Sequence, residues 1–199
     1  MMRLMARAAA RAGVPIKYSQ GFNPRHRISL PLPRPVGVAA LAERAIVELA
    51  EPMATDEAPD RLGGQLPAGV ELIACRLTQG AAPHATAVTY RLDVRRDETE
   101  MLRRRIDAWD RADTWPIRRP SRKRRQAAGD LNLKSLARIA FDGHAATIRL
   151  RPQGNIWARP DEVLEALGLS PSDRARLVRT AIEWKGEQTD WPAQSGERE

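Results

Sequence analysis

The chain has 199 residues, of which 42% are hydrophobic, so it is long enough for one large domain or two small ones with a core of ordinary size. No apolar run approaches the roughly 20 residues of a membrane span, and residues 1–12 lack the hydrophobic core of a signal peptide, so we expect a cytoplasmic protein without a membrane partner. Cys75 is the only cysteine, which excludes an internal disulfide, a cysteine zinc site and a three-cysteine iron–sulfur motif.

The first part of the chain predicts two helices and three strands. Residues 1–12 are typical of an amphipathic helix, because small and apolar side chains share one face and three arginines, Arg3, Arg7 and Arg11, share another. The predicted elements, in order, are a helix at residues 1–12, strands at 27–32 and 45–49, a helix at 56–66 and a strand at 70–77. This order is that of a ferredoxin-like unit whose leading strand is missing.

The stretch at residues 17–38, KYSQGFNPRHRISLPLPRPVGV, is the densest in chemistry. A turn is predicted around Phe22, and the cations that follow it lead into the strand at 27–32. We predict a binding ledge for nucleic acid or an acidic partner, with Arg25 and Arg27 attracting the ligand while Gln20 and Asn23 supply directional hydrogen bonds. The ledge residues are Lys17, Tyr18, Ser19, Gln20, Gly21, Phe22, Asn23, Pro24, Arg25, His26 and Arg27. The same turn can instead serve the fold, in which case Phe22 is a packing residue.

The second part of the chain repeats this order with its first strand present. The predicted elements are strands at residues 87–94 and 114–118, helices at 97–109 and 161–167, a hairpin of strands 137–141 and 145–151 around Asp142-Gly143, and a closing strand at 180–184. We therefore predict an α+β protein of two ferredoxin-like (βαββαβ-type) halves, at residues 1–80 and 81–185. Residues 186–199 are polar and predict a disordered tail.

Positive charge is concentrated at residues 95–125, which hold twelve Arg or Lys against six acids. Six of these cations cluster where Pro120 and the lack of apolar periodicity predict an exposed basic loop at 118–129. Such a loop attracts phosphates by releasing counterions. A solvated loop with no ligand is the alternative. The candidate binding residues are Arg118, Arg119, Arg122, Lys123, Arg124 and Arg125.

Other polar residues give weaker signals. Gly154 and Arg159 flank a turn whose backbone amides can face an anion at the start of the helix at 161–167, although an ordinary glycine turn before Pro160 explains the pattern as well. Asp130 fits the cap of a helical turn better than a catalytic role. The three histidines, His26, His84 and His144, have no metal-site spacing, so we predict neither a metal site nor catalytic residues.

Three stretches resemble a known family, the radical SAM-linked proteins, a domain of unknown function fused to or encoded beside cobalamin-binding radical SAM proteins. They are YSQGFNPRHRISLPLPRPVGV preceded by RAAARAGVPIK, the basic segment running into GDLNL, and QGNIWARPDEVLEALGL, and the resemblance spans roughly residues 1–185. Family members usually open with a strand and a Phe-Leu-Ser-His-Leu-Asp-like segment that this chain lacks, so the resemblance implies an N-terminally truncated member.

The resemblance implies an accessory role beside radical SAM chemistry. A radical SAM protein would be the partner, and the iron–sulfur cluster, S-adenosylmethionine and cobalamin would belong to that partner, with no cofactor bound by this chain. We expect a non-catalytic module that recognises RNA or an acidic partner. Two alternatives stay open: an RNA-modifying enzyme of the pseudouridine-synthase type, and a purely structural partner of the radical SAM protein.

Overall fold

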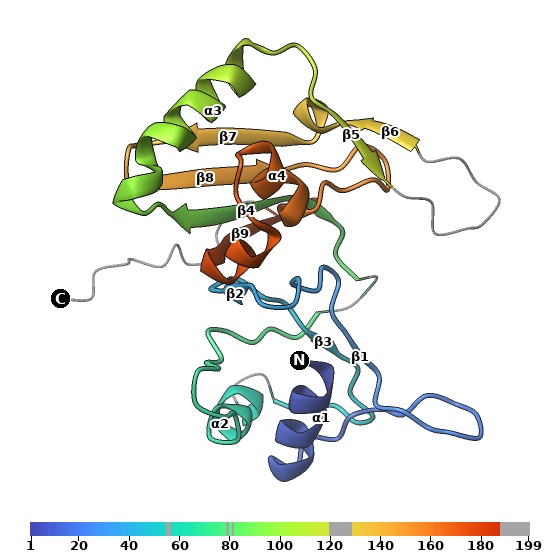
Figure 1. The fold of residues 1–199 in the computed structure, drawn as a ribbon. Coiled ribbons are helices and arrows are strands. Elements are labelled where there is room, and N and C mark those ends of the chain that lie inside the picture. The colour runs from blue at the N-terminus through green and yellow to red at the C-terminus, as the bar shows by residue number, and fades with distance from the viewer. Residues whose placement is uncertain (55–56, 79, 81, 120–128, 188–199) are drawn as a thin grey trace. The chain divides into compact units, whose positions relative to one another are not determined.

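The computed structural model describes residues 1–54, 57–78, 80, 82–119 and 129–187, and it confirms a mixed α+β protein. The chain forms two compact units (Figure 1). Unit 1 comprises residues 1–33 and 44–83, and unit 2 comprises residues 34–43 and 84–199. The segment at 34–43 therefore belongs to unit 2, although the residues on both sides of it belong to unit 1.

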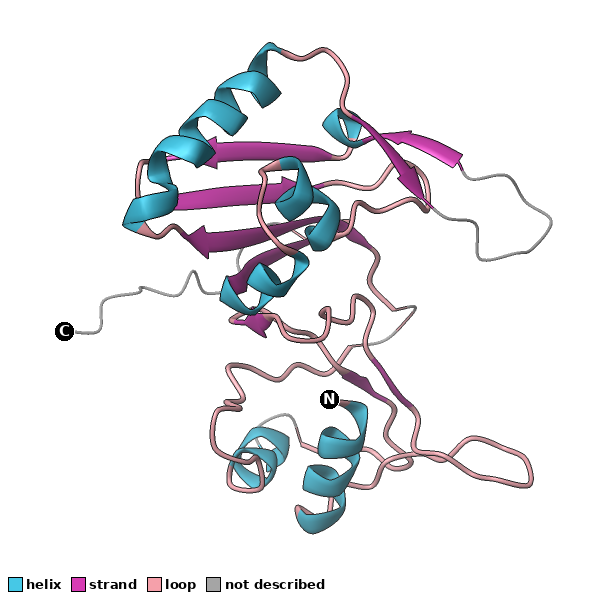
Figure 2. Ribbon diagram, in the orientation of Figure 1, coloured by secondary structure: helices cyan, strands magenta, loops and turns pink. Residues whose placement is uncertain are grey.

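The described residues of unit 1 form two helices and a two-stranded antiparallel sheet. The elements are α1 (Met2–Arg11), β1 (Ile28–Ser29), β3 (Ile46–Val47) and α2 (Glu57–Gly63). Strand β1 pairs with β3, so that Ile28 lies opposite Val47. Both predicted helices are confirmed, and the first two strands are present but shorter than predicted, as Figure 2 shows.

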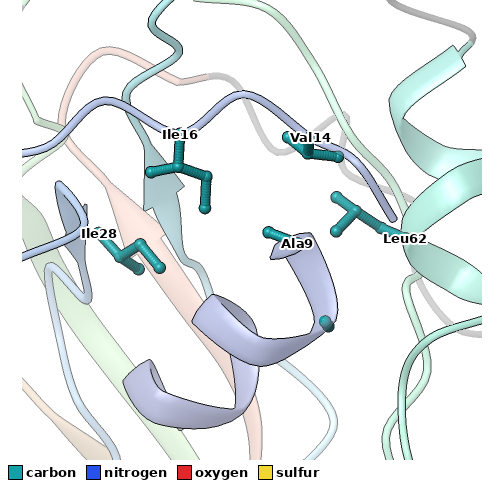
Figure 3. Close-up of a cluster of buried hydrophobic side chains, with 6 residues drawn as sticks. Ala9, Val14, Ile16, Ile28 and Leu62 are labelled. Atoms are coloured by element: carbon teal, nitrogen blue, oxygen red, sulfur yellow. The ribbon is translucent and has the colours of Figure 1, made fainter. Parts of the chain in front are cut away.

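The core of unit 1 is small and aliphatic. It consists of the buried side chains of Ala8, Ala9, Val14, Ile16, Ile28 and Leu62 (Figure 3). These residues come from α1, the segment after it, β1 and α2, so the core joins every element of the unit except β3, whose Val47 packs at its edge. The small side chains of Ala8 and Ala9 let the backbone of α1 approach the core closely, and Met5 of the same helix packs against it.

The predicted third strand of unit 1, at residues 70–77, is wrong. These residues are extended and partly alternate in exposure, and Leu72 packs against the core, but their backbone joins no sheet. A turn precedes them, since the Val70 N–H donates to the Pro67 carbonyl at 3.1 Å. Alternation indicates a half-buried extended segment, whereas a strand also requires a neighbouring edge with which to pair. Without this strand, unit 1 has no complete ferredoxin-like sheet among its described residues.

Unit 2 contains a five-stranded sheet in the order β2-β9-β4-β8-β7. The strands are β2 (Ala39–Ala40), β4 (Ala85–Asp93), β7 (Ala137–Phe141), β8 (Ala145–Leu150) and β9 (Leu177–Trp184), and the helices are α3 (Thr99–Arg111) and α4 (Pro160–Ala166). Strands β9, β4, β8 and β7 are antiparallel neighbours, with α3 after β4 and α4 after β8, which is the ferredoxin-like arrangement predicted for the second half. Both helices cover one face of the sheet (Figure 1).

Strand β2 was not predicted, and a buried ion pair holds its segment to β9. The strand runs parallel to β9, with Ala39 opposite Val178. Arg179 of β9 is fully buried, donates from Nε to the Ala42 carbonyl at 3.0 Å and lies 2.8 Å from a carboxylate oxygen of Glu43. Because Ala42 and Glu43 follow β2, these contacts fix the segment at 34–43 to the sheet.

The turn between β7 and β8 confirms the hairpin predicted from Asp142-Gly143. Gly143 has a φ of 96°, a conformation that glycine adopts without strain. The Asp142 carboxylate accepts hydrogen bonds from the N–H groups of His144 at 2.8 Å and Ala145 at 2.7 Å. These backbone donors, that of Ala145 first, lower the pKa of Asp142 because they stabilise its charged form.

Between α3 and β7 the chain forms a separate antiparallel hairpin of β5 (Pro116–Arg119) and β6 (Gly129–Asn132). Asp130 lies in β6 opposite Arg118, so the predicted capping role of Asp130 is wrong. The cap of the following 3-10 turn, η2 (Leu133–Ser135), is Asn132, whose side chain accepts from the Lys134 N–H at 3.1 Å. Two other 3-10 turns lie in the described part of unit 2, η1 (Arg96–Glu98) and η3 (Pro171–Arg176). No helix in the described part of the chain has the length and hydropathy that crossing a bilayer requires.

Candidate nucleic-acid interface

Residues 17–27 form a hairpin loop on unit 1, which we call the recognition hairpin. Tyr18 and His26 pair across it as an antiparallel bridge. The Ser19 N–H donates to the Arg25 carbonyl and the Arg27 N–H donates to the Lys17 carbonyl, both at 2.8 Å. The Arg25 N–H in turn donates to the Ser19 hydroxyl at 3.0 Å. The backbone of this loop is therefore ordered by its own hydrogen bonds.

The base of the recognition hairpin is anchored in unit 1 (Figure 3). Ile16 and Ile28, which lie just outside its two ends, are 6% and 7% exposed and belong to the core. Glu48 connects both ends to β3, because its carbonyl accepts from the Lys17 N–H at 2.8 Å and its N–H donates to the Arg27 carbonyl at 3.0 Å. The Arg27 side chain also pairs with the Glu48 carboxylate at 3.1 Å.

The tip of the recognition hairpin carries a fully exposed aromatic ring. Phe22 has a relative exposure of 106%, the largest among the exposed hydrophobic residues of unit 1. Gly21 before it has a φ of 123°, which places the tip in a turn that a side chain would strain. Gln20, Asn23 and Pro24 are exposed as well. Phe22 therefore packs no core, and the prediction that it serves the fold is not supported by its position.

Below the tip, Tyr18 and His26 form a second ring surface. Their ring centroids are 4.4 Å apart with an interplanar angle of 37°. Tyr18 remains 50% exposed, whereas His26 is only partly exposed. From the sequence, His26 between two arginines was expected to be an exposed neutral histidine, with contact to a phosphate or a base as the alternative. The structure places its ring against that of Tyr18.

The cations of the recognition hairpin differ in how they are neutralised. Arg27 is paired with Glu48. Lys17 and Arg25 are exposed, and no carboxylate in the described part of the chain lies within ion-pairing distance of either. Two unneutralised cations and two accessible aromatic rings thus lie on one short loop.

The predicted basic loop lies only partly within the described residues. Arg118 is exposed on β5, whereas Arg122, Lys123, Arg124 and Arg125 lie outside the described residues. Arg119 is held by α4: its guanidinium donates to both carboxylate oxygens of Glu162, at 2.6 and 2.7 Å, and to the Trp157 carbonyl at 2.6 Å. Arg119 therefore joins the β5–β6 hairpin to α4. Glu162 already occupies the Nε and Nη2 donors of its guanidinium, so a ligand cannot form the same bidentate pair with them.

Gly154 and Arg159 lie in the segment that leads into α4, and Arg119 contacts this segment at the Trp157 carbonyl. Gly154 has a φ of 58° in a turn closed by two hydrogen bonds of 3.0 Å between Gln153 and Ile156. The Arg159 N–H, at the start of α4, donates to the Glu162 carboxylate at 2.7 Å. An acidic side chain of the protein itself therefore occupies the position that the sequence offered to an external anion. The signal for this was the spacing from Arg159 to Glu162, that of a helix cap to its third residue.

Three features of the described residues concern metal binding, thiol chemistry and the shape of the surface. The described residues contain no cluster of three metal-ligating His, Cys, Asp or Glu side chains. Burial raises the pKa of the Cys75 thiol, which disfavours the nucleophilic thiolate. A hollow of unit 2, about 520 Å³, is open and lined by polar and charged groups that include Asp110, Lys134 and Arg138. Asp130 lies on β6 and does not line it.

Comparison with known proteins identifies a family. Residues 1–150 match the family described as uncharacterized protein conserved in bacteria (DUF2344), and the chain belongs to this family. The match includes all of unit 1, and with it the recognition hairpin, together with unit 2 as far as β8. Neither a curated protein nor a solved structure matches the chain.

Proposed function

We propose that this DUF2344 protein is a non-catalytic recognition module that binds single-stranded RNA through the recognition hairpin. The observation that carries the proposal is the full exposure of Phe22 at the tip of a loop whose backbone is ordered by its own hydrogen bonds. Single-stranded RNA is recognised mainly by stacking of its bases on aromatic rings next to cations. The recognition hairpin presents this combination in Phe22, Tyr18, Lys17 and Arg25.

The energetics favour a ligand over a structural role for Phe22. A buried phenylalanine contributes about 1.5–3 kcal/mol to folding, and Phe22 forgoes this contribution because its ring lies in water. A base that stacks on an aromatic ring gains about 1–3 kcal/mol. Because the loop is already ordered, binding would not have to repay the cost of ordering its backbone.

The proposal extends to a partner and a location. We propose that the RNA is presented to a radical SAM protein, in the cytoplasm, and that the iron–sulfur cluster, S-adenosylmethionine and cobalamin belong to that partner. The support for this step is the resemblance of residues 17–38 to the radical SAM-linked signature. An acidic protein is the competing ligand, and a purely structural partnership without RNA is the competing role.

The test is RNA binding by variants of the hairpin tip. Fluorescence anisotropy with a labelled oligouridylate of about 20 nucleotides would measure affinity for the wild type and for Phe22→Ala. We expect Phe22→Ala to lose about 5- to 150-fold in affinity, the equivalent of one stacked base, with the free energy of unfolding unchanged to within about 0.5 kcal/mol.

The matched control is Val36→Ala, which removes a side chain that is 89% exposed on unit 2. It should change neither affinity nor stability. Wild-type protein that fails to bind the oligouridylate, or Phe22→Ala protein that binds as tightly as the wild type, would refute the proposal. If Phe22→Ala lowers the free energy of unfolding, Phe22 stabilises the fold, as the alternative interpretation of the turn predicts.

A further inference from the structure

Helix α1 carries a row of arginines that its own fold does not explain. Arg3, Arg7 and Arg11 are exposed and recur every fourth residue, so they share one face of the helix. The buried residues Ala8 and Ala9 lie on the other side, against the core of unit 1. At 1.5 Å per residue, the three Cα atoms span about 12 Å along the helix axis. We call this row the α1 arginine ridge.

The α1 arginine ridge works against the stability of its helix. Helix α1 contains no acidic residue, so neighbouring arginines of the ridge repel each other, at a cost of about 0.2–0.5 kcal/mol for each pair four residues apart. Arg3 also lies in the first turn, where the helix dipole disfavours a cation. Only Arg11, in the last turn, is favoured by the dipole.

The contrast with α3 shows that the pattern is not general to this chain. Helix α3 also exposes arginines, but Glu100, Asp107 and Asp110 are interspersed among them. No carboxylate in the described part of the chain pairs with Arg3, Arg7 or Arg11, whereas arginines elsewhere in unit 1, such as Arg27 and Arg61, have acidic partners. The ridge is thus a row of unneutralised positive charge on the unit that carries the recognition hairpin.

We propose that the α1 arginine ridge binds the phosphate backbone of the same single-stranded RNA whose bases stack on the recognition hairpin. Residues 12–16 connect α1 directly to the hairpin, and Val14 and Ile16 within this connection are buried in the core, so the ridge and the hairpin belong to one packed body. A row of cations gives affinity without sequence preference, whereas stacking on Phe22 and Tyr18 engages the bases. This inference rests on the proposed function and adds a second contact surface to it.

The salt dependence of binding distinguishes the two surfaces. For single strands, each phosphate contact contributes about 0.7 to the slope of log affinity against log salt concentration. The triple variant Arg3→Gln, Arg7→Gln, Arg11→Gln should therefore lower the slope by about 2. Between about 50 and 200 mM salt, the loss of affinity of this variant should be about 15- to 20-fold smaller than that of the wild type. Glutamine has nearly the helix propensity of arginine, so α1 is kept.

The matched control is Arg103→Gln, Arg104→Gln, Arg111→Gln on α3, which removes the same charge from unit 2. It should leave the slope unchanged, and the single variant Arg7→Gln should lower it by about 0.7. Circular dichroism would verify the helix content of each variant. Phe22→Ala should weaken binding at every salt concentration without a comparable change of slope.

Each outcome decides a different statement. If Phe22→Ala weakens binding but the ridge variant keeps the wild-type slope, the ridge inference is refuted and the hairpin proposal stands. If the wild type does not bind the oligouridylate, the proposed function fails and the ridge inference fails with it. If poly-L-glutamate displaces the RNA as effectively as unlabelled oligouridylate does, the ridge is a site for an acidic polypeptide, and the assignment to RNA is overturned.

Discussion

The buried ion pair between Arg179 and Glu43 gives the sharpest prediction about the fold. Arg179 is fully buried and the Glu43 side chain is 15% exposed, with a charge separation of 2.8 Å. Removal of one partner leaves the other charge buried without compensation, which costs about 3–5 kcal/mol. Because both carboxylate oxygens of Glu43 are buried as well, we expect Glu43→Ala to cost about 3–5 kcal/mol.

A double variant tests whether the cost comes from the orphaned charge. Replacement of a buried pair by apolar side chains is often neutral or stabilising. Glu43→Ala combined with Arg179→Met should therefore be more stable than Glu43→Ala alone. The measurement is urea unfolding followed by circular dichroism, from which the free energy of unfolding is obtained by linear extrapolation.

Arg149 and Glu183 supply the matched control, because they form a bidentate pair on the same sheet with side chains that are 36% and 38% exposed. Exposed pairs contribute about 0–1 kcal/mol, so Glu183→Ala should cost far less than Glu43→Ala. Equal costs for the two variants would refute the reasoning, since they would show that the burial of Arg179 does not determine the penalty.

Two further predictions concern unit 2. Glu162→Ala should destabilise it by about 1.5–3 kcal/mol in urea unfolding, because Glu162 both pairs with Arg119 and caps α4. Arg118→Ala, at the neighbour of Arg119 on β5, should have little effect. The pKa of Glu98 is lowered chiefly because Arg176 donates to its carboxylate, so the stabilisation is present above the unfolded pKa of about 4.3 and is lost as the pH falls through the lower folded pKa. Glu98→Gln should flatten the acid limb of a stability–pH profile, and an unchanged limb would contradict the assignment.

The sequence predicted the elements whose signals are local. The helical periodicity of residues 97–109 and the proline-first, glycine-last pattern around 161–167 correspond to α3 and α4. Asp142-Gly143 marked the turn between β7 and β8. Together these signals were sufficient for the ferredoxin-like order of unit 2, because that order follows from which elements alternate along the chain.

The sequence could not predict features that depend on distant partners. Strand β2 exists because β9, almost 140 residues later, offers an edge and because Arg179 binds Ala42 and Glu43. The strand at 70–77 fails because no edge reaches it. In the same way, a cluster of arginines reveals positive charge but not which of them is neutralised, so Arg119 was predicted to bind a ligand although Glu162 holds it.

The recognition hairpin separates the two roles between which the sequence left a choice. Its backbone serves the fold, because the carbonyls of Lys17 and Arg25 accept hydrogen bonds across the loop and Ile16 and Ile28 fasten its ends to the core. Its side chains at Phe22, Lys17 and Arg25 point to no partner in the described part of the chain. An ordered backbone with unengaged side chains lowers the entropic cost of binding, which is the property a recognition surface requires. The fold and the binding surface therefore depend on different groups, so substitutions should separate them. Phe22→Ala should lower the affinity for RNA and leave stability unchanged, whereas Ile28→Ala should lower the free energy of unfolding.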